Sequence, residues 1–229
     1  MKYIMPILLI ASMILLTSCG LSNPTGNTVT DTNDKCSSFE GSAKDNCYAE
    51  SFKCSKVKNL NIRDACVVEL AKSKKDLGVC NLIKSGMTKA HCQEEIAILK
   101  NDLSICESID NQYWYDNCNF HLGVNNNDAK ACTMIVKKEQ SEECFKKVAL
   151  ATNNNELCDL TGESRDRCLF NIAERTEDYL LCQEISTHIN RDACRINVAK
   201  VNNNPKPCEY IGYKLIKEDC YNHFAESEV

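Results

Sequence analysis

The sequence has no long run of basic residues, which argues against partners that need one. Its Lys and Arg clusters are no longer than two or three residues, and the chain carries a formal net charge of −5 at pH 7. Nucleic acids demand clustered Lys and Arg to neutralise their phosphates. We therefore expect neither nucleic-acid binding nor electrostatic docking on anionic lipid. The short clusters at 72–75, 137–138 and 146–147 are interpreted as a solvated face.

Motifs that carry catalysis or hold metals are also missing. The chain contains no Gly-rich phosphate loop, no Gly-x-Ser-x-Gly, no Cys-x-x-Cys and no Cys-x-x-Cys-His. The last two patterns are those expected of zinc sites and attached haem. The four histidines are spread along the chain, at His91, His121, His188 and His223. The sequence therefore predicts no catalytic residue, no metal site and no cofactor. A hydrolase with a site formed across several repeats stays a less favoured alternative.

A long apolar run occurs at the N-terminus, where Ile4 to Leu16 follow Lys2. This run is too short to span a bilayer as a helix, for which about 20 residues are needed. A positive residue, a short apolar run and small residues after it are typical of a secretory signal peptide.

The residues after this run sharpen the interpretation. Leu16-Thr17-Ser18-Cys19-Gly20 resembles the lipobox of bacterial lipoproteins. The resemblance implies that residues 1–18 are a signal peptide and that Cys19 becomes the lipidated first residue. The acyl chains, such as palmitate, would then anchor the chain to the membrane. An ordinary secretory signal with a chance cysteine is the alternative.

The resemblance also bears on location. By the usual sorting rule of that family, Gly20 in place of Asp implies the outer membrane if the cell has two membranes. Whether the body faces the periplasm or the outside stays open. Residues 19–35 are rich in Ser, Thr, Asn and Gly, so we expect a flexible tether after the lipidated cysteine.

The remaining part, residues 36–229, is defined by its cysteines. The chain has 17 cysteines, and those other than Cys19 are expected to form disulfides in an exported protein. A first pair, Cys36 and Cys47, is followed after seven residues by Cys54. From Cys54 on, the steps alternate between 12 and 14 residues, with one step of 10, which predicts a tandem repeat of about 26 residues. These repeated cysteines are Cys54, Cys66, Cys80, Cys92, Cys106, Cys118, Cys132, Cys144, Cys158, Cys168, Cys182, Cys194, Cys208 and Cys220.

Other residue types repeat around the second cysteine of each pair. Four residues later stands an apolar residue: Leu70, Ile96, Leu122, Val148, Ile172, Val198 or Phe224. Five residues later stands a small one: Ala71, Ala97, Gly123, Ala149, Ala173, Ala199 or Ala225. Two residues earlier, most units have an acid: Asp64, Asp116, Glu142, Asp166, Asp192 or Glu218. We expect a helix of about ten residues here, in which the acid complements the N-terminal end and the small residue admits a neighbouring helix.

A second, shorter helix is predicted around the first cysteine of each pair. Four residues before it stands an Asp or Asn that suits an N-cap: Asp76, Asp102, Asp128, Asn154, Asp178 or Asn204. Pro205 would take the first helical position. Each unit is thus an αα-hairpin that cannot bury its apolar stripe alone, so stacking of units must supply the core.

Two disulfide schemes compete, and the 12-residue step is favoured. It joins helices that pack antiparallel, so Cys80 and Cys92 lie side by side. Joining Cys66 to Cys80 would leave an axial mismatch of about 8 Å, whereas a disulfide tolerates a Cα separation of about 7 Å at most. That scheme would also leave Cys36 and Cys220 unpaired. The predicted pairs are 36–47, 54–66, 80–92, 106–118, 132–144, 158–168, 182–194 and 208–220.

The predicted fold class is therefore all-α: a disulfide-stapled αα-hairpin repeat solenoid. It resembles the broad class of α-solenoids, including tetratricopeptide repeats, and the cysteine-rich Sel1-like proteins, although its repeat is shorter and their Trp, Leu-Gly and Tyr consensus is absent. The resemblance implies a protein-binding or scaffolding role, with Tyr113, Trp114 and Tyr115 as candidate partner-binding residues. A passive structural or protective envelope component is the alternative function, and covering of a hairpin end is the alternative role for the three rings.

Overall fold

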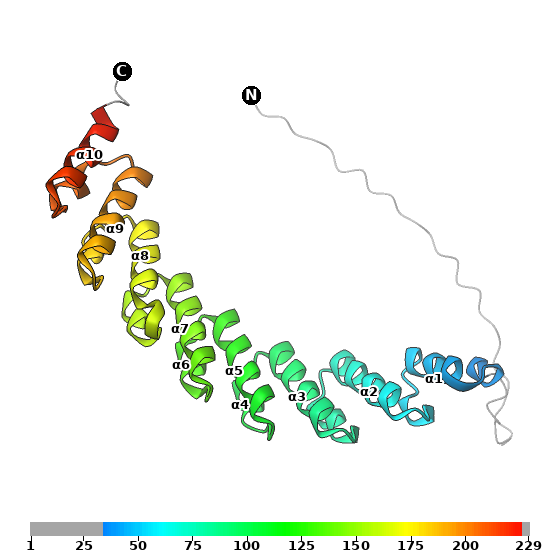
Figure 1. The fold of residues 1–229 in the computed structure, drawn as a ribbon. Helices are drawn as coiled ribbons and strands as arrows, with labels where there is room; N and C mark the ends of the chain where they lie inside the picture. Colours follow the sequence, from blue (N-terminus) through cyan, green and yellow to red (C-terminus); the bar gives the residue numbers. More distant parts are fainter. Residues whose placement is uncertain (1–33, 226–229) are drawn as a thin grey trace, which may run out of the picture. The chain divides into compact units, whose positions relative to one another are not determined.

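The computed structural model describes residues 34–225, which form helices joined by short turns (Figure 1). The predicted signal peptide, Cys19 and all but the last two residues of the predicted tether lie outside the described residues. The chain divides into a unit of residues 1–35 and a unit of residues 36–229, and every α-helix within 34–225 belongs to the second. None of these helices is long and apolar enough to cross a membrane.

Long α-helices alternate with short helices along the described chain, and no strand occurs within it. The long ones are α1 (Gly41–Glu50), α2 (Leu60–Lys74), α3 (Gly86–Lys100), α5 (Gln112–Asn126), α7 (Lys138–Thr152), α8 (Arg165–Thr176), α9 (His188–Val201) and α10 (Lys214–Ala225). The short ones are η1 (Lys35–Ser38), η2 (Cys54–Lys56), η3 (Leu77–Leu82), α4 (Leu103–Cys106), α6 (Ala129–Met134), η4 (Asn155–Leu160), η5 (Gly162–Ser164), η6 (Leu181–Glu184) and η7 (Lys206–Tyr210). The prediction of an all-α repeat is confirmed.

The two helices of a unit differ in length more than the sequence predicts. The long helices α2, α3, α5 and α7 each have 15 residues instead of about ten. They begin earlier because, in most of these units, a polar residue seven positions before the second cysteine caps them. Side chains of Asn59, Ser85, Asn111 and Thr187 accept the hydrogen bonds of free N–H groups there.

The short helices have only 3 to 6 residues, and most are 3₁₀-helices. The predicted Asp and Asn caps are confirmed for η3, α4, α6 and η4, whereas η6 and η7 begin after Leu180 and Pro205 and have no side-chain cap. In each of six units the side chain accepts a hydrogen bond from the N–H two residues later: Asp76, Asp102, Asp128, Asn154, Asp178 and Asn204. Pro205 lies one residue before η7, which begins at Lys206.

A left-handed residue ends most of the long helices. It is an asparagine at Asn101, Asn127 and Asn153, with φ of 54°, 55° and 54°. The next residue then donates its N–H to the small residue five positions earlier, as in Asp102 to Ala97 at 3.0 Å. Asparagine tolerates this conformation better than most residues, which explains the Asn-rich turns.

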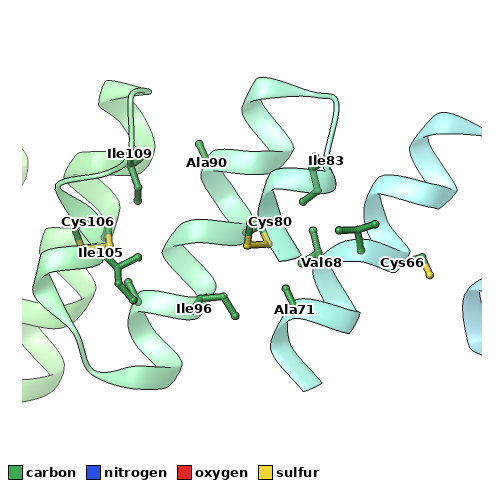
Figure 2. Close-up of a cluster of buried hydrophobic side chains, with 14 of the residues drawn as sticks. Cys66, Val68, Ala71, Cys80, Ile83, Ala90, Ile96, Ile105, Cys106 and Ile109 are labelled. Carbon is green, nitrogen blue, oxygen red and sulfur yellow. A yellow bond between two sulfur atoms is a disulfide. The ribbon is translucent and has the colours of Figure 1, made fainter. Parts of the chain in front are cut away.

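Disulfides join the two helices of every unit. The eight observed pairs are the eight predicted ones, with Cα–Cα distances between 5.5 and 5.8 Å. Around them, buried apolar side chains from successive units form the core. Figure 2 shows this between neighbouring units: Ile83 and Ile109 lie close to their loops, whereas Ala71 and Ile96 lie further along the long helices.

The first disulfide, between Cys36 and Cys47, differs from the others in its surroundings. Its Cα–Cα distance is 5.5 Å, and it closes a loop that is one residue shorter than most. Cys36 is buried, but Cys47 is only partly buried, unlike the second cysteine of every other unit. The reason is that no earlier unit within residues 34–225 covers α1. The pairing of Cys47 is therefore as predicted, while its enclosure is less complete than the repeat pattern implies.

The small residue allows the close approach of the next unit, as predicted, except in the last repeat, where Ala225 is exposed. Ala71, Ala97, Ala149, Ala173 and Ala199 are fully buried. At Gly123 a Cβ atom would lie 2.9 Å from the Sγ atom of Cys144 and 3.3 Å from the Cβ atom of Ala131. The next disulfide therefore lies where a larger side chain at Gly123 would be.

The repeated acid has a different role from the predicted one. In most units the long helix begins earlier than expected, so the acid lies beyond its first turn. Asp116, which is buried, accepts hydrogen bonds from the backbone N–H groups of Val136 and Lys137, at 2.9 and 3.0 Å, in the loop of the next unit. Equivalent bonds from the following unit reach Asp45, Asp64, Asp166 and Asp192. These carboxylates connect consecutive units.

Candidate binding surface

Apolar side chains project into solvent from the loops that the disulfides close. Each of the eight loops exposes at least one large apolar residue, and these loops lie at the N-terminal ends of the long helices. The exposed residues are Phe39, Leu60, Leu82, Met87, Tyr113, Val136, Leu160, Ile189, Tyr210, Tyr213, Leu215 and Ile216. Single exposed apolar residues are ordinary, but their recurrence in every loop gives this edge a regular apolar character.

A second repeated feature is the space between two successive long helices, which we call the furrow. Three positions define it: the residues one before and two after the second cysteine of one unit, and the residue four before the second cysteine of the next. Between α3 and α5 these are His91, Glu94 and Trp114. Between α8 and α9 they are Arg167, Phe170 and Asn190, which line an observed cavity.

Trp114 fills the furrow between α3 and α5. Its ring lies 4.7 Å from the His91 ring, centroid to centroid, and it packs against the core together with Tyr115. Tyr113 is 64% exposed and meets Trp114 edge-on at 5.1 Å. The three predicted partner-binding residues therefore lie in the first turn of α5 and have unequal roles. Trp114 and Tyr115 are packing residues, and Tyr113 is the one available to a partner.

Glu94 lies below the same furrow, and its neighbours are not evident from the sequence. It is buried, with its carboxylate 3.5 Å from Nδ1 of His91 and 3.8 Å from Nε2 of His121. Burial raises the pKa of Glu94, and the two histidines oppose that rise. Four other units have Val68, Phe120, Phe170 or Ile196 at this position. Glu94 could have been identified from the sequence as a charged residue at a repeat position that is mostly apolar.

A polar pair closes the furrow between α5 and α7. Between α5 and α7, Nε2 of Gln140 donates to Oδ1 of Asn117 at 2.9 Å. Along α7, Lys146 forms an ion pair with Glu143 of the same helix. The furrow between α8 and α9 instead contains a cavity of about 400 Å³. Asn190 is too short to fill the space that Trp114 fills between α3 and α5.

The lysine clusters lie on the solvated surface, where several form ion pairs. Lys72 lies 3.3 Å from Glu69 and 3.2 Å from Glu95, and these contacts, above all with Glu95, raise the pKa of its ammonium group. Within residues 34–225, no group of three or more His, Cys, Asp or Glu side chains is arranged to hold a metal ion.

The fold and this surface define an all-α repeat protein whose units are joined internally by disulfides. Comparison with known protein families, curated proteins and solved structures finds no match to the chain.

Proposed function

We propose that the chain is an exported, lipid-anchored protein that binds a protein partner through the repeated surface of its helical units. The observation that carries the proposal is the exposed apolar edge, on which every disulfide loop contributes at least one large apolar side chain. Exposed apolar surface on a protein of this kind favours association with another macromolecule. The likeness in architecture to Sel1-like and tetratricopeptide repeats supports the same role by analogy.

The anchoring part of the proposal is supported by the lipobox-like residues that end at Cys19. Its test is metabolic labelling with an alkyne-bearing palmitate in a bacterial host. We expect the full chain to incorporate the label and to remain in the membrane fraction after an alkaline carbonate wash. Cys19→Ser is the matched variant and should lose both properties. Equal labelling of the two proteins would contradict lipid attachment at this residue.

The binding part is tested in intact cells by photo-crosslinking from single surface positions. A photoreactive residue at Tyr113, on the apolar edge, should yield a discrete crosslinked product. The same residue at Asn127, in a turn at the opposite end of α5, serves as the control and should not. Crosslinking of neither position, combined with turnover of a small substrate by the purified protein, would favour the hydrolase alternative.

A passive envelope component is the second candidate, because eight disulfides suit a durable spacer. Deletion of residues 81–132 removes two whole periods and brings Cys80 into register with Cys144. A spacer should tolerate this shortening without loss of function. A binding protein should lose its crosslinked product if the deleted units hold the site.

A further inference from the structure

The furrow between α8 and α9 is an open groove with an apolar floor and a polar rim. Phe170 and Ile185 form the apolar part, and Ala193 of α9 adds little bulk. Arg167 and Asn190 line its rim from α8 and α9. Its volume of about 400 Å³ is within the range of sites that bind small groups.

The repeat itself shows what such a furrow can hold. Trp114 stands four residues before Cys118, and Asn190 stands four residues before Cys194. His91 and Arg167 are likewise equivalent, because each precedes the second cysteine of its unit. In the furrow between α3 and α5, the indole of Trp114 lies against the ring of His91 at 4.7 Å. In the furrow between α8 and α9, Asn190 stands in the place of Trp114, so no ring fills this position. Arg167, with its planar guanidinium, stands in the place of His91.

The charges around the groove favour a ligand with a negative group. The guanidinium of Arg167 has no hydrogen bond or ion pair within the described part of the chain, and it borders the cavity. Asp166 also lines the cavity, but its carboxylate accepts bonds from the N–H and hydroxyl groups of Ser186 at 3.1 and 2.9 Å. Arg165 lies 3.6 Å from the same carboxylate and pairs more closely with Asp159, at 2.7 Å.

We propose that this groove binds an aromatic side chain of a partner polypeptide that carries a carboxylate beside the ring. The ring packs on the guanidinium of Arg167 beside Phe170, in the place that the tilted Trp114 ring takes against His91. The carboxylate pairs with the donors of the same guanidinium. The inference rests on the proposed protein-binding function and specifies the chemistry of the partner at this one site.

The probe is acetyl-Asp-(5-fluoro-Trp)-amide, titrated into the full chain in detergent and followed by ¹⁹F NMR. A two-residue probe should bind with a dissociation constant on the order of 1 mM. The matched probe acetyl-Asn-(5-fluoro-Trp)-amide has the same ring without the charge and should bind about tenfold more weakly. No binding of the first probe at concentrations up to about 10 mM would overturn the proposal.

Two variants test the geometry. Asn190→Trp places an indole where Trp114 stands in the other furrow, so it should abolish binding of both probes without lowering the melting temperature. Arg167→Gln should weaken the Asp probe at least about tenfold. It should weaken the Asn probe by a smaller factor, because that probe loses the contact of its ring with the guanidinium but no ion pair. Binding of the Asp probe within twofold of the unmodified protein in either variant would refute the assignment. If Asn190→Trp lost its helical far-UV signal, the test would rest on Arg167→Gln with the same two probes. Arg167 is exposed, so this variant should keep the fold.

These outcomes separate the inference from the proposed function. A crosslinked partner at Tyr113 in cells, with no probe binding at the furrow, would refute the inference alone. Probe binding without any crosslinked partner would support the groove and count against the proposed function.

Discussion

Buried carboxylates carry much of the connection between consecutive units. Asp116 is 3% exposed, and it accepts bonds from two backbone N–H groups of the next unit and from Nε2 of Gln112. A buried donor left without a partner costs about 1–3 kcal/mol. We therefore expect Asp116→Ala to lower the free energy of unfolding by about 2–4 kcal/mol in urea denaturation. Asp110→Ala, at an exposed acid nearby, is the control, and equal effects of the two would argue against the connection.

Gly123 shows how closely the units approach. A methyl group there would lie 2.9 Å from the sulfur of Cys144, which a real Cβ contact does not tolerate. Gly123→Ala should destabilise the protein by about 1–3 kcal/mol, measured by thermal unfolding. Gly86→Ala is the matched control, because a Cβ atom at Gly86 meets open space. That variant should be neutral or slightly stabilising, since alanine is the better helix former.

Ionised Glu94 should lower the stability of the protein at neutral pH, whereas a paired carboxylate would raise it. Burial raises its folded-state pKa above the usual 4.5, so its ionised form opposes folding at neutral pH. This cost is relieved as the pH falls through the raised pKa. Glu94→Gln should therefore be more stable than the unmodified protein at pH 7, and the difference should vanish below about pH 4.5. A loss of stability at pH 7 would mean that the two histidines outweigh burial.

Asp45 should give the protein the pH dependence of stability that is usual for a hydrogen-bonded carboxylate. The N–H groups of Lys58 and Asn59 lower its pKa in the folded state below 3.8. Its contribution to stability is then complete above pH 3.8 and is lost as the pH falls toward the lowered value. Asp45→Asn should flatten the acid limb of a plot of melting temperature against pH. An unchanged acid limb would contradict this role.

At the scale of helices, the sequence predicted the positions of the helices better than their lengths. The cysteine spacing located both helices of every unit, and the Asp and Asn caps marked the starts of four short helices, η3, α4, α6 and η4. The long helices were predicted too short because their caps, such as Asn59 and Ser85, lie outside the periodic apolar pattern. The acids were then assigned to a helix end instead of to the following loop, since a contact across units has no local signature.

The furrows could not be predicted because each depends on three positions from two units. Trp114 was visible as an unusual residue, but its contact with His91 requires the relative placement of α3 and α5. The open groove at Asn190 is recognisable only against the filled one. Asn190 alone gives no distinctive signal in the sequence, because Thr88 and Ser164 are also short polar residues at this position.

Because contacts are between neighbouring elements, the last unit should be dispensable. The short helix η7 packs on α9, and α10 packs on η7. A chain that ends at Asn202 should therefore keep seven disulfides and the same ellipticity per residue at about 25 °C, with a melting temperature lowered by several degrees. Circular dichroism provides the measurement. Loss of most helical signal would show that the units do not fold as a locally connected array.

For the whole described part of the chain, stability rests on many small cores connected in series. Each loop closed by a disulfide has about a dozen residues, and closing such a loop stabilises the folded state by roughly 3 kcal/mol in the chain-entropy model. The units interact, so these contributions do not simply add. Disulfides within units fix each pair of helices, and the buried acids and small residues join one unit to the next.

Disulfide mapping of the purified protein by mass spectrometry, without prior reduction, tests this arrangement most directly. Every bridged peptide pair should join the two cysteines of one unit, such as Cys36 with Cys47 or Cys80 with Cys92. No free thiol should be found among the sixteen cysteines from Cys36 to Cys220. A bridge between Cys66 and Cys80, or a set of free thiols, would contradict the assignment of one disulfide to each two-helix unit.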